Sequence, residues 1–186
     1  MGFEWLRLEL DITTFDSAPF EEEVRQVRDS GIALVTLDEL GADEANLRRL
    51  FALNAECAAD IPERGPFHTW EAYRRLRIDV SSFDPAGIVV ALDGDRWVGL
   101  AGSADHRARG YLFNEITGVV RSHRRRGIAL AMKVHHMDYV RSSDVRILRT
   151  VHHPANAAII ALNRRLGYTD ATWPYPEPKT GSEASE

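Results

Sequence analysis

Residues 3–12 alternate between apolar and polar side chains, with leucine at every second position over most of the segment. A period of two places successive side chains on opposite faces, so this segment is predicted to be a half-buried strand. A short helix is predicted at residues 18–29, because Pro19 suits a first helical turn and Gly31 suits a helix exit. Residues 32–37 are predicted as the next strand.

The remaining chain alternates between helical and strand patterns. Apolar residues spaced three or four apart predict helices, and short apolar runs predict strands. The sequence Asp93-Gly94-Asp95 between two such runs is a strong hairpin signal. The predicted helices are residues 43–59, 70–76, 126–141 and 155–166, and the predicted strands are residues 88–92, 97–101, 111–120 and 145–151.

This order of elements predicts an α/β fold with a mixed sheet. The chain has 186 residues, of which 44% are hydrophobic and 27% charged, as in an ordinary globular domain and unlike a disordered or fibrous chain. The single cysteine, Cys57, cannot form an internal disulfide and is expected to be buried and inert. With no secretory signal pattern and no apolar run long enough to span a membrane, the protein is expected to be cytoplasmic.

The most informative segment is residues 117–133, TGVVRSHRRRGIALAMK. A predicted strand runs into a turn with the pattern Arg124-x-x-Gly127-x-Ala129, and a helix begins inside that turn. A helix start carries backbone N–H groups without intrahelical partners and a partial positive charge, so it suits a phosphate. Glycine allows close approach of the backbone, and the arginines add charge and forked donors. The segment therefore indicates a pyrophosphate site.

A second motif, N-x6-N-x-x-L-G-Y, occupies residues 156–168 after the next predicted strand. Together with Val119, five residues before Arg124, the two motifs resemble those of the Gcn5-related N-acetyltransferase (GNAT) superfamily. That family has a V-x4-[QR]-x-x-G-x-[GA] acetyl-CoA loop and an N-x6-[YN]-x-x-LG[FY] helix. The likeness covers about residues 32–173.

The resemblance implies a single-domain, GNAT-like α/β fold with a mixed, mostly antiparallel sheet, splayed central strands and flanking helices. Acetyl-CoA lies between the splayed strands in that family, with its pantetheine arm paired to strand backbone and its diphosphate in the loop. The family usually transfers an acetyl group directly to the amine of a small molecule or peptide, without an acyl-enzyme. The cofactor-binding residues implied here are Val119, Val120, Arg124, Arg125, Arg126, Gly127, Ile128, Ala129, Asn156 and Asn163.

Direct transfer needs a base for the amine, a donor for the oxyanion and an acid for the thiolate. Glu115, within the strand that leads to Val119, is the candidate base; the alternative is a solvent-facing strand carboxylate. A backbone N–H near Val119 or Val120 suffices for the oxyanion. Many relatives carry a tyrosine at the position of Asn163 to protonate the sulfur, so here a water, Tyr168 or another side chain must act.

The loop at residues 61–69 corresponds to the acceptor-side loop of the family. The amine site would then be lined by Asp60, Glu63, His68 and Trp70; the alternative is that these are ordinary surface residues.

Only 18 residues follow Tyr168, and the last ten of them are polar. The remainder is too short for the two-stranded hairpin that closes the sheet in the family. Residues 5–10 are therefore expected to supply the final strand, either within the chain or by exchange with a neighbour, which makes a homodimer a candidate. The expected organisation is an N-terminal extension at 1–31, an acetyltransferase domain at 32–176 and a disordered tail at 177–186.

Three other interpretations follow from isolated features. The basic run at 121–126 could bind nucleic acid, but a net charge of −5 and the lack of interleaved aromatics disfavour it. Adjacent histidines at 135–136 and 152–153 point apart and have no completing ligand set, so no metal is expected. The absence of a tyrosine at Asn163 favours a non-catalytic acyl-CoA-binding module as the alternative function.

Overall fold

The computed structural model describes residues 4–59, 61 and 65–173; the predicted tail at 177–186 lies outside them. Within these residues the strands are β1 (Leu6–Asp11), β2 (Ile32–Thr36), β3 (Ile88–Asp93), β4 (Arg96–His106), β5 (Tyr111–Val119), β6 (Ile147–His152) and β7 (Thr169–Asp170). The α-helices are α1 (Glu21–Asp29), α2 (Leu37–Leu40), α3 (Glu44–Ala58), α4 (Trp70–Tyr73), α5 (Ile128–Ser142) and α6 (Ala157–Arg165).

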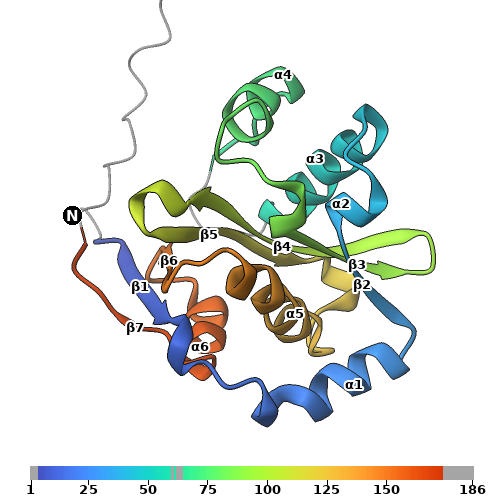
Figure 1. Cartoon of the computed structure of the whole chain (residues 1–186). Coiled ribbons are helices and arrows are strands. Elements are labelled where there is room, and N and C mark those ends of the chain that lie inside the picture. Colours follow the sequence, from blue (N-terminus) through green and yellow to red (C-terminus); the bar gives the residue numbers. More distant parts are fainter. Residues whose placement is uncertain (1–3, 60, 62–64, 174–186) are drawn as a thin grey trace, which may run out of the picture.

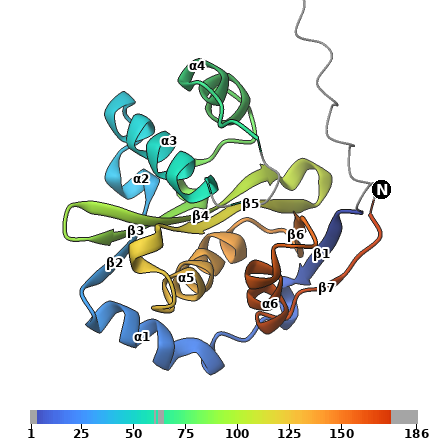
Figure 2. The same ribbon diagram turned by 180° about the vertical axis from the view of Figure 1, so that it is seen from behind.

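The strands form one sheet in the order β2-β3-β4-β5-β6-β1-β7, in which only β5 and β6 pair in parallel. Helices α2, α3 and α4 lie on one face of the sheet, and α1, α5 and α6 lie on the other (Figure 1; Figure 2). This arrangement confirms the predicted α/β class with a mixed, mostly antiparallel sheet. It also places α5, which follows the phosphate-loop motif, against the centre of the sheet.

Strands β5 and β6 part soon after they meet. Their parallel pairing covers three residue pairs, from Tyr111↔Ile147 to Phe113↔Arg149, whereas β5 continues to Val119. One further contact joins them at the next position, where the Thr150 hydroxyl donates to the backbone oxygen of Asn114 at 2.9 Å. Beyond this point the two strands diverge, as the sequence resemblance implied, and a gap opens between them.

The N-terminal strand completes the sheet from within the same chain. Strand β1 pairs antiparallel with β6 along its whole length, from Leu6↔His152 to Asp11↔Ile147, and its other edge holds β7. Leu8 and Leu10 are buried in a core shared with α5, β6 and the segment after α6. Of the two expected arrangements, the structure therefore shows pairing within the chain.

Replacing Leu8 with alanine is expected to lower the free energy of unfolding by about 2–5 kcal/mol, because this fully buried side chain would leave a cavity. Replacing Glu9 with alanine in the same strand removes only a half-exposed carboxylate 3.5 Å from Arg149, so a loss below about 1 kcal/mol is expected. Urea denaturation of both variants measures the difference. Equal stability of the two variants would show that β1 is dispensable for the core.

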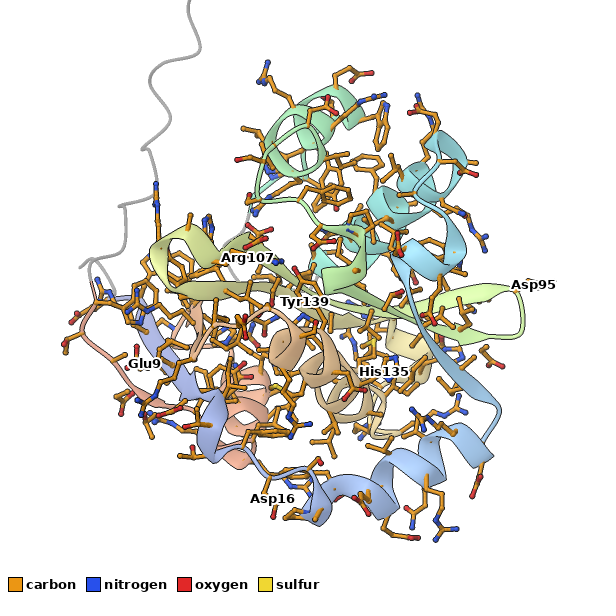
Figure 3. The ribbon with its side chains drawn as sticks, viewed as in Figure 1. Glu9, Asp16, Asp95, Arg107, His135 and Tyr139 are labelled. Carbon is orange, nitrogen blue, oxygen red and sulfur yellow. The ribbon has the colours of Figure 1, made fainter. Side chains whose placement is uncertain are left out.

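Helix α5 is fastened to the sheet near its C-terminal end. Tyr139 points from α5 toward Arg107 (Figure 3), and its hydroxyl donates to Asp84 Oδ2 at 2.9 Å. The ring lies so close to Gly87 that a Cβ there would be 2.8 Å from it. These contacts fix the direction of α5 and therefore the position of its opposite, N-terminal end.

Several boundaries differ from the predictions. Helix α5 begins at Ile128 rather than at residue 126, because Gly127 adopts a left-handed conformation and precedes the first helical residue. The predicted helix at 70–76 is one turn of α4 followed by a π-helical turn at Arg74–Ile78. Helix α2 was not predicted, although Thr36 and Glu39 form a capping box that marks its start.

Candidate functional site

The loop between β5 and α5 has a backbone suited to an anion. Arg125 and Gly127 both have positive φ, at 61° and 77°, so the loop turns sharply twice before the helix begins. Alternating left- and right-handed residues direct successive N–H groups into a concavity that binds anions. A left-handed arginine costs free energy, and such strain concentrates at functional sites.

The first turn of α5 leaves its amides available. Gly127 is the residue before the helix and provides no side-chain cap, and the Ala131 amide donates to Gly127 O at 3.0 Å. The amides of Ile128, Ala129 and Leu130 therefore lie at the positive end of the helix dipole. Together with the arginines of the loop, they give this end of the pocket the positive charge and N–H donors that suit an anion.

The loop is held in place by contacts to both neighbours. His123 Nε2 lies 2.9 Å from Asp93 Oδ2 in the β3–β4 hairpin, and the hydrogen bond from His123 holds the pKa of Asp93 below its usual range. Arg124 Nε donates to the backbone oxygen of Val119 at 2.9 Å, which ties the loop back to β5. The loop is therefore preorganised.

A pocket of about 490 Å³ extends from this loop to the gap beside β5. Helix α6 forms one wall, and an ion pair between Arg165 of α6 and Glu23 of α1 lies at its rim. The Arg165 guanidinium holds the pKa of Glu23 below its usual range. The lining residues are Glu23, Cys57, Ile61, Thr117, Gly118, Val119, His123, Arg124, Arg125, Gly127, Ile128, Ala129, Leu130, Asn156, Ala158, Ile159, Leu162 and Arg165.

Seven of the ten predicted cofactor-binding residues line this pocket, and three do not. Val120 and Asn163 are fully buried, and Arg126 is exposed outside the lining. The Val120 amide donates to Val98 O at 2.9 Å, so it is not available to a ligand. Because successive strand residues direct their amides to alternate edges, the amide of Val119 faces the gap.

The pocket reaches the α3 side of the sheet at Gly118. A Cβ on Gly118 would lie 2.6 Å from Cys57 Cβ of α3, so only glycine allows the helix to lie this close. Cys57 is buried, as predicted, but it also lines the pocket. Its position next to Gly118 was not visible in the sequence, because it depends on the packing of α3 over β5.

A smaller pocket of about 80 Å³ lies between α3, the α4 segment and β5. Glu115 and His68 line it, and two of its buried side chains, Asn54 and Ser103, carry oxygens without a hydrogen-bond partner among the described residues. Ile116 belongs to this pocket and the next residue of β5 to the larger one. The linings of the two pockets are therefore consecutive along β5.

Glu115 faces the smaller pocket and not the larger one. Its carboxylate accepts a hydrogen bond from Arg77 Nη1 at 2.6 Å, and its side chain is 33% exposed. Glu115 is therefore an exposed, ion-paired carboxylate that lines a pocket, and its role as the base stays a prediction. The pocket presents both a carboxylate and a guanidinium.

The predicted acceptor-side residues are only partly placed. His68 lines the smaller pocket, whereas Trp70 packs against Phe51 with ring centroids 5.6 Å apart and beneath the guanidinium of Arg48. Asp60 and Glu63 lie outside the described residues.

Tyr168 and Asn163 are buried between α6 and the sheet. Asn163 Nδ2 donates to His152 Nε2 at 2.7 Å, which requires a neutral imidazole. The Tyr168 hydroxyl has no hydrogen-bond partner among the described residues, and burial raises its pKa. Neither residue lines either pocket, so the role of Tyr168 as an acid stays a prediction.

A buried histidine, His136, and a partly buried one, His152, are expected to make the fold sensitive to acid. Burial, and secondly the charge of Lys133, lowers the pKa of His152 to about 4 and that of His136 to about 3. Between these values and 6.5 the unfolded chain binds more protons than the folded chain, so stability falls as the pH falls.

The unfolding free energy is expected to decrease from pH 6.5 to pH 5, by about 1 kcal/mol per pH unit for each histidine. Ordinary carboxylates stay ionised in this window. Substitution of His152 by asparagine should roughly halve the slope in urea titrations, whereas an unchanged slope would show that His152 does not titrate as proposed.

Two further features were not found among the described residues. Among residues 4–59, 61 and 65–173, no set of three or more His, Cys, Asp or Glu side chains is placed to hold a metal ion. In the same part of the chain, no helix has both the length and the apolar character needed to cross a membrane.

Solved structures share this fold. A GCN5-related glucosamine N-acetyltransferase region of a fungal multi-domain GH3 beta-N-acetylglucosaminidase has a TM-score of 0.66 at 12% identity, over 92% of this chain and 20% of that one. A GCN5-related N-acetyltransferase from Sphaerobacter thermophilus has a TM-score of 0.62 at 20% identity, over 90% and 48%. This chain thus spans a fifth and about half of the lengths of these two proteins.

A third structure contains ligands. The diaminobutyrate acetyltransferase of Paenibacillus lautus, solved with L-2,4-diaminobutyric acid and coenzyme A, has a TM-score of 0.55 at 21% identity, over 72% of this chain and 73% of that one. The comparison with curated proteins gave no match. A model of the acetyltransferase (GNAT) family matches residues 47–168, more than half of the chain, so this chain belongs to the GNAT acetyltransferase family.

Proposed function

We propose that this protein transfers an acetyl group from acetyl-CoA to the primary amine of a small molecule or peptide, by direct attack in a ternary complex. The observation that carries the proposal is the junction of the two pockets. One pocket runs from a diphosphate-type loop to the gap beside β5, and the other, with Glu115 at its rim, adjoins it at Ile116 and Thr117. An acyl group and an amine bound in these pockets would therefore meet.

The larger pocket suits acetyl-CoA along its length. The amides at the start of α5, with Arg124 and Arg125, bind the diphosphate. The backbone of Val119, which faces the gap, pairs with the pantetheine arm. Asn156 and the apolar face of α6 cover the opposite side. The acetyl thioester then lies between the strands, close to Thr117 and Gly118.

The chain supplies the base and the donor that stabilises the oxyanion, and water serves the thiolate. Glu115 takes the proton of the ammonium group, and the amine nitrogen attacks the carbonyl carbon. Another backbone amide on the gap side of β5, near Val119, stabilises the oxyanion as the C–N bond forms and the C–S bond breaks. The attacking nitrogen loses its second proton as the amide forms, and water in the pocket carries this proton to the departing thiolate, because Tyr168 and Asn163 are buried and do not line the pocket.

The test is release of free coenzyme A thiol from acetyl-CoA in the presence of primary amines. Because Arg77 and Glu115 lie together in the smaller pocket, the panel pairs amines that carry a carboxylate with matched amines that lack one, and includes peptides. Thiol release that requires both protein and amine, with an N-acetylated product by mass spectrometry, supports the proposal.

The alternative is a non-catalytic acyl-CoA-binding module, which the amide at position 163 favours because that side chain is a poor acid. Asn163 also bonds to His152 rather than to the pocket. Micromolar binding of acetyl-CoA by calorimetry without thiol release for any amine in the panel would support the module and contradict the enzyme.

A further inference from the structure

Strand β5 contains a one-residue bulge at Glu115. Gly102 of β4 lies opposite Ile116, but the next residue, Ser103, lies opposite Asn114, so Glu115 has no partner in the ladder. A bulge interrupts the alternation of side chains along a strand. As a result the consecutive residues Glu115 and Ile116 both line the smaller pocket.

The bulge is bridged from the opposite face of the sheet by the side chain of Asn114. Its Nδ2 donates to the backbone oxygen of Gly102 at 2.8 Å and also lies 3.3 Å from the oxygen of Ile116. The two acceptors flank the bulged residue, one on each strand. The amide of Asn114 therefore fixes the backbone on both sides of Glu115.

Lys133 of α5 holds that amide in place. Its ammonium donates to Asn114 Oδ1, and its side chain is 2% exposed. In the described part of the chain, Lys133 has no ion pair with a carboxylate. Its ammonium nitrogen also lies 5.2 Å from the centroid of the Tyr168 ring. Burial lowers the pKa of Lys133 to about 7.

A buried amino group with one oxygen partner is costly, and an apolar side chain would fill the same space in the core. Burial of the Lys133 amino group therefore lowers the stability of the fold, and its contacts among the described residues do not evidently offset this loss. The one oxygen that accepts from Lys133 belongs to Asn114, whose amide nitrogen holds the backbone on both sides of the bulge. The bulge in turn sets the direction of the Glu115 side chain.

We propose that Lys133 is a positioning residue: through Asn114 it fixes the β5 bulge and thereby directs Glu115 into the amine pocket. This inference rests on the proposed function for its effect on rate, but not for its effect on the bulge. Lys133 touches neither pocket, so it acts through Asn114 and not on the substrates.

The experiment compares Lys133→Met, Asn114→Ala and the double variant with the unchanged protein. Lys133→Met is expected to lower kcat for the amine by about tenfold or more, with KM for acetyl-CoA changed less than about twofold. If both residues act as one unit, the double variant should be no slower than the slower single variant. Met137→Ala, a buried change one turn along α5, controls for loss of stability.

Hydrogen exchange gives a readout independent of turnover. Amides in residues 102–104 and 114–117 are expected to exchange faster in Lys133→Met and Asn114→Ala, and at the unchanged rate in Met137→Ala. In a Glu115→Gln background, Lys133→Met should lower kcat no further.

The two proposals fail in different ways. An unchanged protein that acetylates no amine would contradict the proposed function, while faster exchange at the bulge would still support the clamp. Unchanged exchange in both clamp variants, or additive losses of kcat in the double variant, would overturn the role of Lys133 even if the enzyme is active. A Lys133→Met protein that does not fold leaves Asn114→Ala to decide by the same two readouts.

Discussion

Replacement of Gly127 by glutamate is expected to abolish measurable binding of acetyl-CoA, with an increase in Kd of at least about 100-fold. Gly127 has a φ of 77°, which strains any L side chain, and a Cβ there would lie 3.2 Å from Val27 Cγ2. The added carboxylate would also lie at the start of α5, where the proposed diphosphate needs positive charge. Isothermal titration calorimetry with acetyl-CoA measures the loss.

Gly110→Glu is the matched control. Gly110 has a φ of 82°, so it carries a similar backbone strain, but no atom lies within 4 Å of its Cβ position and it does not line the pocket. Its Kd should stay within about threefold of the unchanged protein. Equal affinity in the Gly127 and Gly110 variants would place the phosphate site away from the start of α5.

Replacement of Glu115 by glutamine is expected to lower kcat by about 100-fold or more while leaving the affinity for acetyl-CoA unchanged. Glutamine keeps the size of the side chain and an oxygen for the hydrogen bond from Arg77, but it cannot take a proton. Because Glu115 lines the smaller pocket and not the larger one, the loss should appear in kcat and not in cofactor binding.

Glu9→Gln controls for the loss of a strand carboxylate near an arginine, since Glu9 of β1 lies 3.5 Å from Arg149 of β6. Steady-state rates of thiol release for both variants, with calorimetric Kd values, separate chemistry from binding. Full activity in Glu115→Gln would move the base elsewhere, and a matching loss in Glu9→Gln would point to a general effect of charge.

The strand, turn and helix around Gly127 were predictable because their parts are contiguous. An anion site at a helix start is built from consecutive backbone amides, so Arg124, Gly127 and Ala129 in sequence already imply the local geometry. The structure adds that Arg125 is also left-handed and that Arg126 lies outside the pocket lining. Neither is visible in a pattern of residue types, since both depend on the loop dihedrals.

The role of residues on α6 was less predictable. Asn156 and Asn163 stand at the two asparagine positions of the motif, yet Asn156 lines the pocket and Asn163 is buried against His152. Motif spacing places a residue on a helix, but the rotation of that helix against the sheet decides which side chains face the ligand. Arg165 and Ile159, which do line the pocket, were missed for the same reason.

The sequence by itself determined the local elements of this protein: the strand alternation of β1, the β3–β4 hairpin signal and the strand, turn and helix of the phosphate loop. Each of these depends on residues close together in the chain, where periodicity and backbone preferences act directly. Tertiary structure alone decided that β1 pairs with β6 and that the glycine at position 118 allows α3 to pack closely against β5. It also decided that Lys133 of α5 reaches Asn114 of β5. These contacts join distant segments, and a single bulged residue changes which face a strand side chain takes, so no local pattern carries them.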